Sequence, residues 1–133
     1  MIKIFTKLIL SIGLLLGCCA AHATEWIPIF LNKDVQKYYD NSTVKRIDGV
    51  VTLWTLTNYL QTPDSLKTKI KSVKTLESYD CKNRKYRSLG GNAYASFDGK
   101  GNLLEQSPEQ KVWFLVIPET IGEVEFTRVC NIK

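Results

Sequence analysis

Four cysteines and a single histidine are the residues in this 133-residue chain that could supply a nucleophile, a metal ligand or a disulfide. His22, Cys18 and Cys19 lie near the N-terminus, whereas Cys81 and Cys130 lie in the body of the chain. If residues 1–23 are removed, as argued below, no histidine remains. A histidine-based triad, a histidine general base and a histidine-containing zinc site are then excluded.

Other catalytic patterns are also missing from the sequence. It contains no Gly-x-Ser-x-Gly elbow, and Cys81 and Cys130 do not form a CxxC redox pair. Glu123 and Glu125 would not converge as a glycosidase pair on a helix, because residues two apart do not share a helix face. The loop around Lys100 lacks an oxygen ligand that a calcium loop needs. We therefore expect no enzyme activity, no cofactor and no metal site.

Cationic side chains are the remaining candidates for a binding site, and they form two groups. The first group precedes Cys81 and consists of Lys67, Lys69, Lys71 and Lys74. In an extended strand, residues 67, 69 and 71 would share one face, with cations about 6.5 Å apart. Such a row attracts acidic protein segments, sulfated polysaccharide or lipid headgroups. The alternative is a solvated edge strand whose lysines prevent aggregation.

The second cationic group follows Cys81 and consists of Arg84, Lys85 and Arg87. Guanidinium groups suit carboxylates and sulfates, and the two groups would share one neighbourhood if their strands pair as a hairpin. We call residues 67–87 the basic hairpin. The alternative is local ion pairing with Asp80 and Glu77. Tyrosines interleave with these cations, but an exported protein meets little nucleic acid, so we expect no nucleic-acid partner.

Residues 1–23 have the pattern of a secretory signal peptide. Lys3 and Lys7 precede an apolar run over 8–17, and the Ala21-His22-Ala23 sequence predicts cleavage between Ala23 and Thr24. The run is too short for a transmembrane helix, which needs about 20 residues. In the alternative, residues 15–18 act as a lipobox and Cys18 is lipidated. Both interpretations, a cleaved signal peptide and a lipidated Cys18, predict export to the periplasm or the outer-membrane surface. Contact with the membrane would then arise only through the lipid on Cys18.

Cysteine counting favours a disulfide in the exported protein. Cleavage after Ala23 leaves Cys81 and Cys130 as an even pair, and disulfides are common in exported domains. A bridge that closes a loop of about 50 residues is worth about 4 kcal/mol. The alternative is two separate buried thiols.

The remaining chain, 24–133, has the length of one folded domain. The full sequence has 44% hydrophobic residues and a net charge of +5, which is the composition of a folded protein. Residues 24–133 consist mostly of predicted strands. The first half has 26–31, at an edge or irregular because of Pro28, an extended piece that passes into a turn over 38–42, 43–47 before an Asp48-Gly49 turn, and a central strand over 50–60. The second half has 68–79, 84–89 before a bulge or bend at Gly90-Gly91, 94–97 and 103–105 around a turn, and 113–117.

The C-terminal tail has two interpretations. Pro118 to Thr120 is typical of the first turn of a helix, with Ile121, Val124 and Arg128 on one side and Val129 and Cys130 toward that side. Alternation of apolar and acidic residues over 123–126 favours a strand instead. Periodicity alone leaves both open.

The order of several short motifs resembles the surface-adhesin protein E-like family of Gram-negative bacteria. These motifs are Asp80-Cys81-Lys82-Asn83-Arg84, Tyr86-Arg87, Trp113, Ile117-Pro118 and Val129-Cys130. The resemblance implies an α+β fold: an antiparallel sheet of about six strands with a C-terminal helix tied to one sheet face by a Cys81–Cys130 disulfide. It also implies that the tail is a helix, although Pro118-Glu119-Thr120 replaces the family's Pro-Gly-Ser.

The resemblance also implies a function. In the family's namesake, a surface lipoprotein, a basic stretch before the first cysteine contributes to binding host matrix and plasma proteins such as vitronectin and laminin. The matching segment here is Lys67 to Lys74. We therefore expect a non-enzymatic, adhesin-like binding module of the envelope that binds acidic or host matrix macromolecules through the basic hairpin. The alternative is a periplasmic structural protein that self-associates through a sheet edge, for example as a homodimer.

Overall fold

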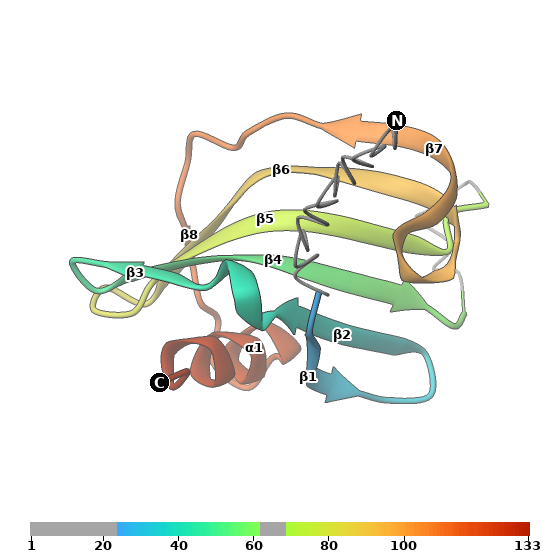
Figure 1. Cartoon of the computed structure of the whole chain (residues 1–133). Coiled ribbons are helices and arrows are strands. Elements are labelled where there is room, and N and C mark those ends of the chain that lie inside the picture. Colours follow the sequence, from blue (N-terminus) through green and yellow to red (C-terminus); the bar gives the residue numbers. More distant parts are fainter. Residues whose placement is uncertain (1–23, 62–68) are drawn as a thin grey trace, which may run out of the picture.

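The computed structural model describes residues 24–61 and 69–133, which form one antiparallel sheet and one α-helix (Figure 1). The sheet runs in the order β1-β2-β4-β5-β6-β7, with the short strands β3 and β8 paired to β4 and β6. The elements are β1 (Trp26–Leu31), β2 (Val35–Asp40), β3 (Lys45–Ile47), β4 (Val50–Tyr59), β5 (Ser72–Asp80), β6 (Lys85–Ser96), β7 (Lys100–Ser107), β8 (Phe114–Leu115) and α1 (Ile121–Cys130), with short 3-10 turns η1 (Asn41–Thr43) and η2 (Phe97–Gly99). The α+β prediction is confirmed, and six long or medium strands carry the sheet.

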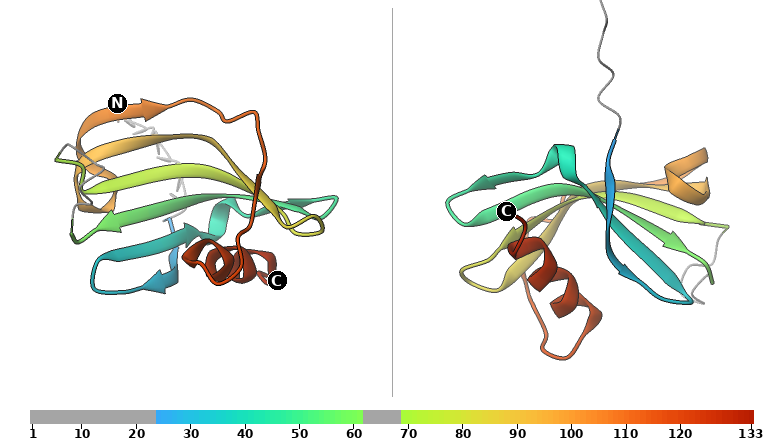
Figure 2. Two further views of the ribbon diagram at one scale, coloured as in Figure 1. Left: turned by 180° about the vertical axis from the view of Figure 1, so that it is seen from behind. Right: turned by 60° about the horizontal axis from the view of Figure 1, so that its bottom comes forward.

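The helix packs on one face of the sheet and leaves the other face without a helix (Figure 2). Val51 and Leu53 of β4 are fully buried against Phe126 and Val129 of α1. Because side chains alternate along a strand, Trp54 of β4 points to the opposite face. We call these two sides the helix face and the open face. As predicted, β4 is a central strand with apolar groups on both faces.

Turn residues act largely as the sequence predicts. Asp48 and Gly49 adopt positive φ angles of 49° and 80° and join β3 to β4 in a tight hairpin. Of the predicted bulge or bend at Gly90-Gly91, the structure has the bulge, because Leu76 pairs with Gly90 while Glu77 pairs with Ser88. The chain nevertheless continues through it, so the two strands predicted over 84–89 and 94–97 are one strand, β6.

Pro28 has the predicted effect on the first strand. β1 is an edge strand, and its register with β2 shifts between Pro28 and Phe30. Proline lacks an N–H for the ladder, which explains both the edge position and the irregularity.

The helix exists, but it begins later in the chain than the sequence-based expectation. Glu119 has a positive φ of 60°, so the helix begins only at Ile121, with the Thr120 hydroxyl accepting a hydrogen bond from the Glu123 N–H at 3.3 Å. Ile121 and Val124 are 56% and 54% exposed. The sheet is instead contacted by the Phe126 and Val129 side of the helix.

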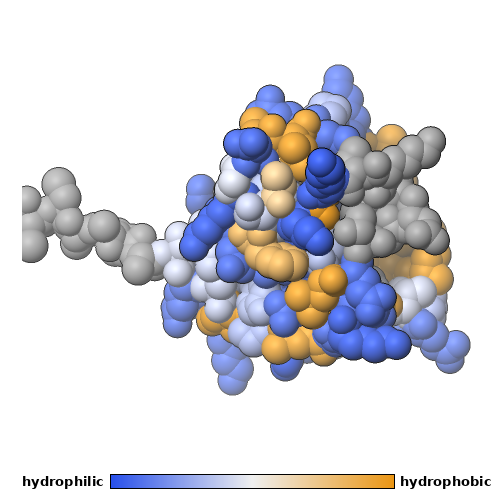
Figure 3. Space-filling model, turned by 90° about the vertical axis from the view of Figure 1, so that its right-hand side faces the viewer, coloured by the Kyte–Doolittle hydropathy of each residue, from blue (hydrophilic) through white to orange (hydrophobic). Residues whose placement is uncertain are grey.

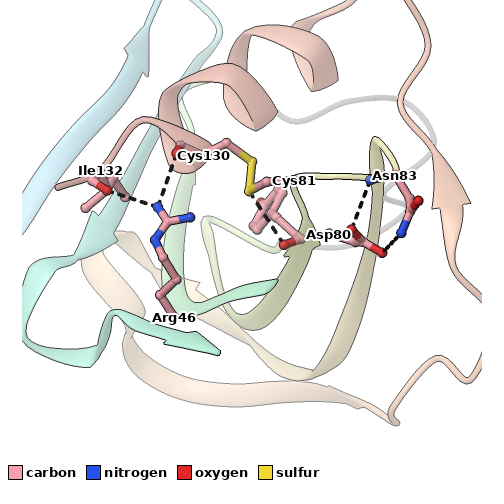
Figure 4. Close-up of a disulfide and its surroundings, with 7 residues drawn as sticks. Arg46, Asp80, Cys81, Asn83, Cys130 and Ile132 are labelled. Carbon is pink, nitrogen blue, oxygen red and sulfur yellow. Dashed lines mark hydrogen bonds between the residues drawn. A yellow bond between two sulfur atoms is a disulfide. The ribbon is translucent and has the colours of Figure 1, made fainter. Parts of the chain in front are cut away.

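A disulfide joins Cys81, just after β5, to Cys130, the last residue of α1, with a Cα–Cα distance of 5.7 Å (Figure 4). Beside it, the Arg46 guanidinium donates hydrogen bonds to the carbonyl oxygens of Cys130, at 3.1 Å, and Ile132, at 3.0 Å. The predicted pairing is confirmed. It fixes the C-terminal end of the helix to the sheet, where β3 also holds it.

Candidate functional site

The basic hairpin is a real hairpin, because β5 and β6 pair along their length, but its two cationic groups lie at opposite ends of it. Lys74 pairs with Asn92 in the register, whereas Asp80 pairs with Lys85 next to the connecting turn. The expectation of one shared neighbourhood is therefore wrong: in an antiparallel pair, residues far from the turn on one strand cannot meet residues at the turn. Lys67 lies outside the described residues.

The first group forms a surface that we call the lysine end, comprising Lys69, Lys71 and Lys74. Lys69 and Lys71 precede β5, and β5 lies inside the sheet, so neither the predicted lysine row on a strand nor an edge strand is formed. Within residues 24–61 and 69–133, none of the three has a carboxylate partner within ion-pair distance. Figure 3 views this end of the molecule and shows hydrophilic side chains interspersed with apolar ones.

Aromatic rings accompany two of these lysines. The Lys71 ammonium lies 5.8 Å from the ring centre of Phe97. The Lys74 ammonium lies 5.7 Å from the ring centre of Trp26 and 6.0 Å from that of Tyr94. Aromatic faces attract cations without neutralising them, so these ammonium groups keep their charge for an external anion.

The second group is largely neutralised within the protein. Arg84 forms an ion pair with Glu123 at 2.6 Å, and Arg87 forms one with Glu109 at 3.5 Å. The Arg87 guanidinium also lies 4.8 Å from the ring centre of Trp113. The arginines thus have local partners, but these are not the carboxylates that the sequence suggested.

Lys85 lies beside Asp80, one of the carboxylates that the sequence suggested as a partner, although the two are not within ion-pair distance. They face each other in the register. Hydrogen bonds from the Asn83 side chain and backbone lower the pKa of Asp80, and Lys85 lowers it further. Figure 4 shows Asn83 on the Asp80 carboxylate beside the disulfide.

A buried ionic cluster, which the sequence did not reveal, lies between α1 and the sheet and consists of Lys37, Glu77, Tyr79 and Glu125. The Lys37 ammonium contacts Glu77 at 3.2 Å and also pairs with Glu125. The Tyr79 hydroxyl donates to Glu77 at 2.8 Å and also contacts Glu125. A small cavity of about 190 Å³ adjoins the cluster. The three charged side chains are only 11–15% exposed.

One ammonium shared by two carboxylates leaves a surplus negative charge in this cluster. Burial alone would lower the pKa of Lys37, but the two carboxylates outweigh it and raise that pKa. Burial and the neighbouring Glu77 raise the pKa of Glu125, whereas Lys37 and the Tyr79 hydroxyl overcome burial and lower the pKa of Glu77. Glu125 is therefore the carboxylate that takes up a proton first. The cluster connects β2, β5 and α1, and its role is to hold the helix in position on the sheet.

Two further properties concern the described part of the chain. Within it, no three histidine, cysteine or acidic side chains gather into a group that could hold a metal ion. Within the same residues, no helix has the length and apolar character needed to cross a membrane.

Comparisons with known proteins agree on one family. Residues 26–131 match the family described as surface-adhesin protein E. A search of curated proteins gave no match. Among solved structures, the chain is similar to protein E from non-typeable Haemophilus influenzae, with a TM-score of 0.54, 18% identity, and coverage of 77% of this chain and 74% of that one.

A second crystal form of Haemophilus influenzae protein E gives a TM-score of 0.57 at 14% identity, covering 81% of this chain and 95% of that one. At such identities, structural similarity establishes the fold, while the match over almost the whole described domain establishes the family. The chain belongs to the surface-adhesin protein E family and is an adhesin-like, non-enzymatic protein of the cell envelope.

Proposed function

We propose that this protein is exported after cleavage between Ala23 and Thr24 and binds acidic regions of host matrix macromolecules through the lysine end. The observation that supports this most directly is the contrast between the two ends of the basic hairpin. The arginines beyond the turn have internal carboxylate partners, whereas Lys69, Lys71 and Lys74 have none among the described residues. Unpaired surface cations attract an acidic partner by long-range electrostatics.

The partner is an extended acidic macromolecule, such as an acidic segment of vitronectin or a sulfated polysaccharide. Lysine is a flexible point charge, and it gives attraction that depends on salt more than on detailed geometry. Lys67 belongs to the same stretch of sequence and adds to the same charge. Membrane contact needs no part of this surface and would arise only through lipidation of Cys18.

The test is binding of the purified protein to immobilised vitronectin and to heparin over a series of salt concentrations. The variant Lys69→Gln/Lys71→Gln removes two charges at the lysine end, and Arg84→Gln/Arg87→Gln is the matched control with two charges removed at the turn. We expect the lysine variant to bind much more weakly and the control to bind nearly normally. Affinity should also fall between about 0.1 M and 1 M salt, as the Debye length shortens from about 10 Å to about 3 Å. Affinity that responds to neither salt nor the lysine changes would overturn the proposal.

A second candidate function is self-association through the edge strand β7. All eight residues of β7 are exposed, including Leu103 at 50% and Leu104 at 41%. A long exposed edge is a template for pairing with a second copy. Light scattering of the protein and of a Leu103→Lys/Leu104→Lys variant tests this, and a strict monomer at high concentration would refute it.

A further inference from the structure

The open face carries two adjoining hollows that share Trp54 and Asn92. One, of about 340 Å³, is lined by Trp26, Lys74 and Tyr94, and the other, of about 510 Å³, extends past Gln106 towards β7. Small-molecule sites typically have volumes of about 300–1,000 Å³. From this geometry we infer that the groove binds a single anionic sugar residue, a pyranose that carries one carboxylate or sulfate group.

Lys74 gives the groove its charge preference. Its ammonium is held against the rings of Trp26 and Tyr94, and no carboxylate of the described residues pairs with it. Asp40 lines the same hollow but is nearly buried and already accepts hydrogen bonds from the Ser42 N–H and hydroxyl, at 3.0 and 2.6 Å. The free positive charge therefore selects an anion.

The position of Lys74 is fixed by the fold. Its aliphatic stem lies so close to Gly99 of η2 that a Cβ at that position would collide with the Lys74 Cδ and Cε. Asn58 and Asp98 hold η2 in place through reciprocal hydrogen bonds of 2.8 and 2.9 Å. A cation held in this way loses little freedom when a ligand binds, unlike the exposed Lys69.

The other lining groups match the body of a sugar. The faces of Trp26, Trp54 and Tyr94 carry negative π-density that attracts the weakly positive C–H bonds of a pyranose ring. Asn92 accepts from Gln106 at 3.3 Å, and its own NH₂ group has no acceptor among the described residues. This amide can donate to a ring hydroxyl. Thr24 lines the same hollow, so cleavage before it would add an α-ammonium at the rim.

This inference rests on the proposed function, since it names the chemical group of an acidic partner that enters a defined site, but the two can be tested separately. The probes are soluble N-acetylneuraminic acid and a 6-sulfated N-acetylglucosamine, with unmodified N-acetylglucosamine as the neutral comparison. Binding to the exported, disulfide-bonded protein is measured by calorimetry. Tryptophan fluorescence gives a second signal, because two tryptophans lie in the groove.

The variant Lys74→Met keeps the aliphatic stem and removes the charge, while Lys33→Met, at an exposed lysine outside the groove and the lysine end, is the matched control. Losing a charge-assisted hydrogen bond should weaken binding of an anionic sugar about tenfold or more. The control should change it by no more than about twofold, as expected for an exposed, screened charge. Trp54→Leu should also weaken binding, and circular dichroism checks that each variant is folded. The neutral sugar should bind more weakly than either charged probe, and the relative affinities of the carboxylate and sulfate probes identify the anion.

Three results would overturn the inference: no binding of either charged sugar, equal losses in Lys74→Met and Lys33→Met, or an acidic tetrapeptide that binds as well as the sugars. None of these results affects binding to immobilised vitronectin through Lys69 and Lys71. Conversely, sugar binding without binding to either vitronectin or heparin would refute the proposed function and leave this inference standing.

Discussion

Replacing Lys37 by methionine would leave Glu77 and Glu125 facing each other without a cation between α1 and the sheet. All three side chains are 11–15% exposed, so solvent screens the repulsion poorly. Removing one partner of a buried ion pair typically costs about 3–5 kcal/mol. Protonation sets an upper limit: neutralising one glutamate with an ordinary pKa of about 4.3 at pH 7 costs about 3.7 kcal/mol, at 1.36 kcal/mol per pH unit. We therefore expect a loss of about 3–4 kcal/mol in the free energy of unfolding at pH 7.

Protonation of Glu125 also sets how the stability of the Lys37→Met variant depends on pH. In the folded variant the carboxyl pKa of Glu125 lies above its unfolded value, so the folded state binds a proton that the unfolded chain releases. Stability that depends on this proton is present at low pH and is lost as the pH rises. Between pH 7 and pH 5, the deficit relative to the unmodified protein should shrink by about 1.4 kcal/mol for each pH unit.

Urea unfolding at pH 5, 6 and 7 measures both quantities. The double variant Lys37→Met/Glu125→Gln is the control: it removes the repulsion between the two carboxylates and returns the cluster to its original net charge, so it should recover part of the stability and part of the original pH dependence. A deficit below about 1 kcal/mol at pH 7, or one that is the same at pH 5, would refute this account of the cluster.

Three other predictions follow from the fold. Cys81→Ser/Cys130→Ser should lose about 4 kcal/mol in urea unfolding, and an unchanged midpoint would show that the bridge contributes little. Thr120→Ala removes the helix cap and should cost about 1 kcal/mol, whereas Thr120→Ser should be nearly neutral in the same assay. Intact-mass measurement of the exported protein should give a chain that begins at Thr24 and lacks the two thiol hydrogens; an acyl group on Cys18 would contradict that cleavage site.

The sequence was informative where local chemistry decides the structure. The β-branched and aromatic residues of 50–60, with apolar groups on both faces, predicted β4. Asp48-Gly49 predicted its hairpin turn, because positive φ angles at both positions favour these residues. The Cys81–Cys130 bridge followed from counting cysteines. These features depend on neighbours in sequence or on a choice with few alternatives.

The sequence was uninformative where distant segments meet. Lys37, Glu77 and Glu125 come from three separate elements, and each alone has the pattern of a solvent-facing residue. The residues of the sugar groove come from β1, β4, β5 and β6, so only the strand order brings Trp26 to Lys74. Which side of α1 is buried is likewise determined by the disulfide and the sheet, and apolar periodicity alone left it undecided.

The separation of Cys81 and Cys130 by 49 residues has a consequence for biogenesis. If the protein is exported as proposed, Cys81 leaves the cytoplasm before its partner and stays a free thiol until Cys130 and the helix that carries it have followed. During that interval Cys81 is reactive and open to mispairing with other envelope thiols. A chain that stalls or is clipped between the two cysteines cannot form the bridge and remains exposed to this mispairing.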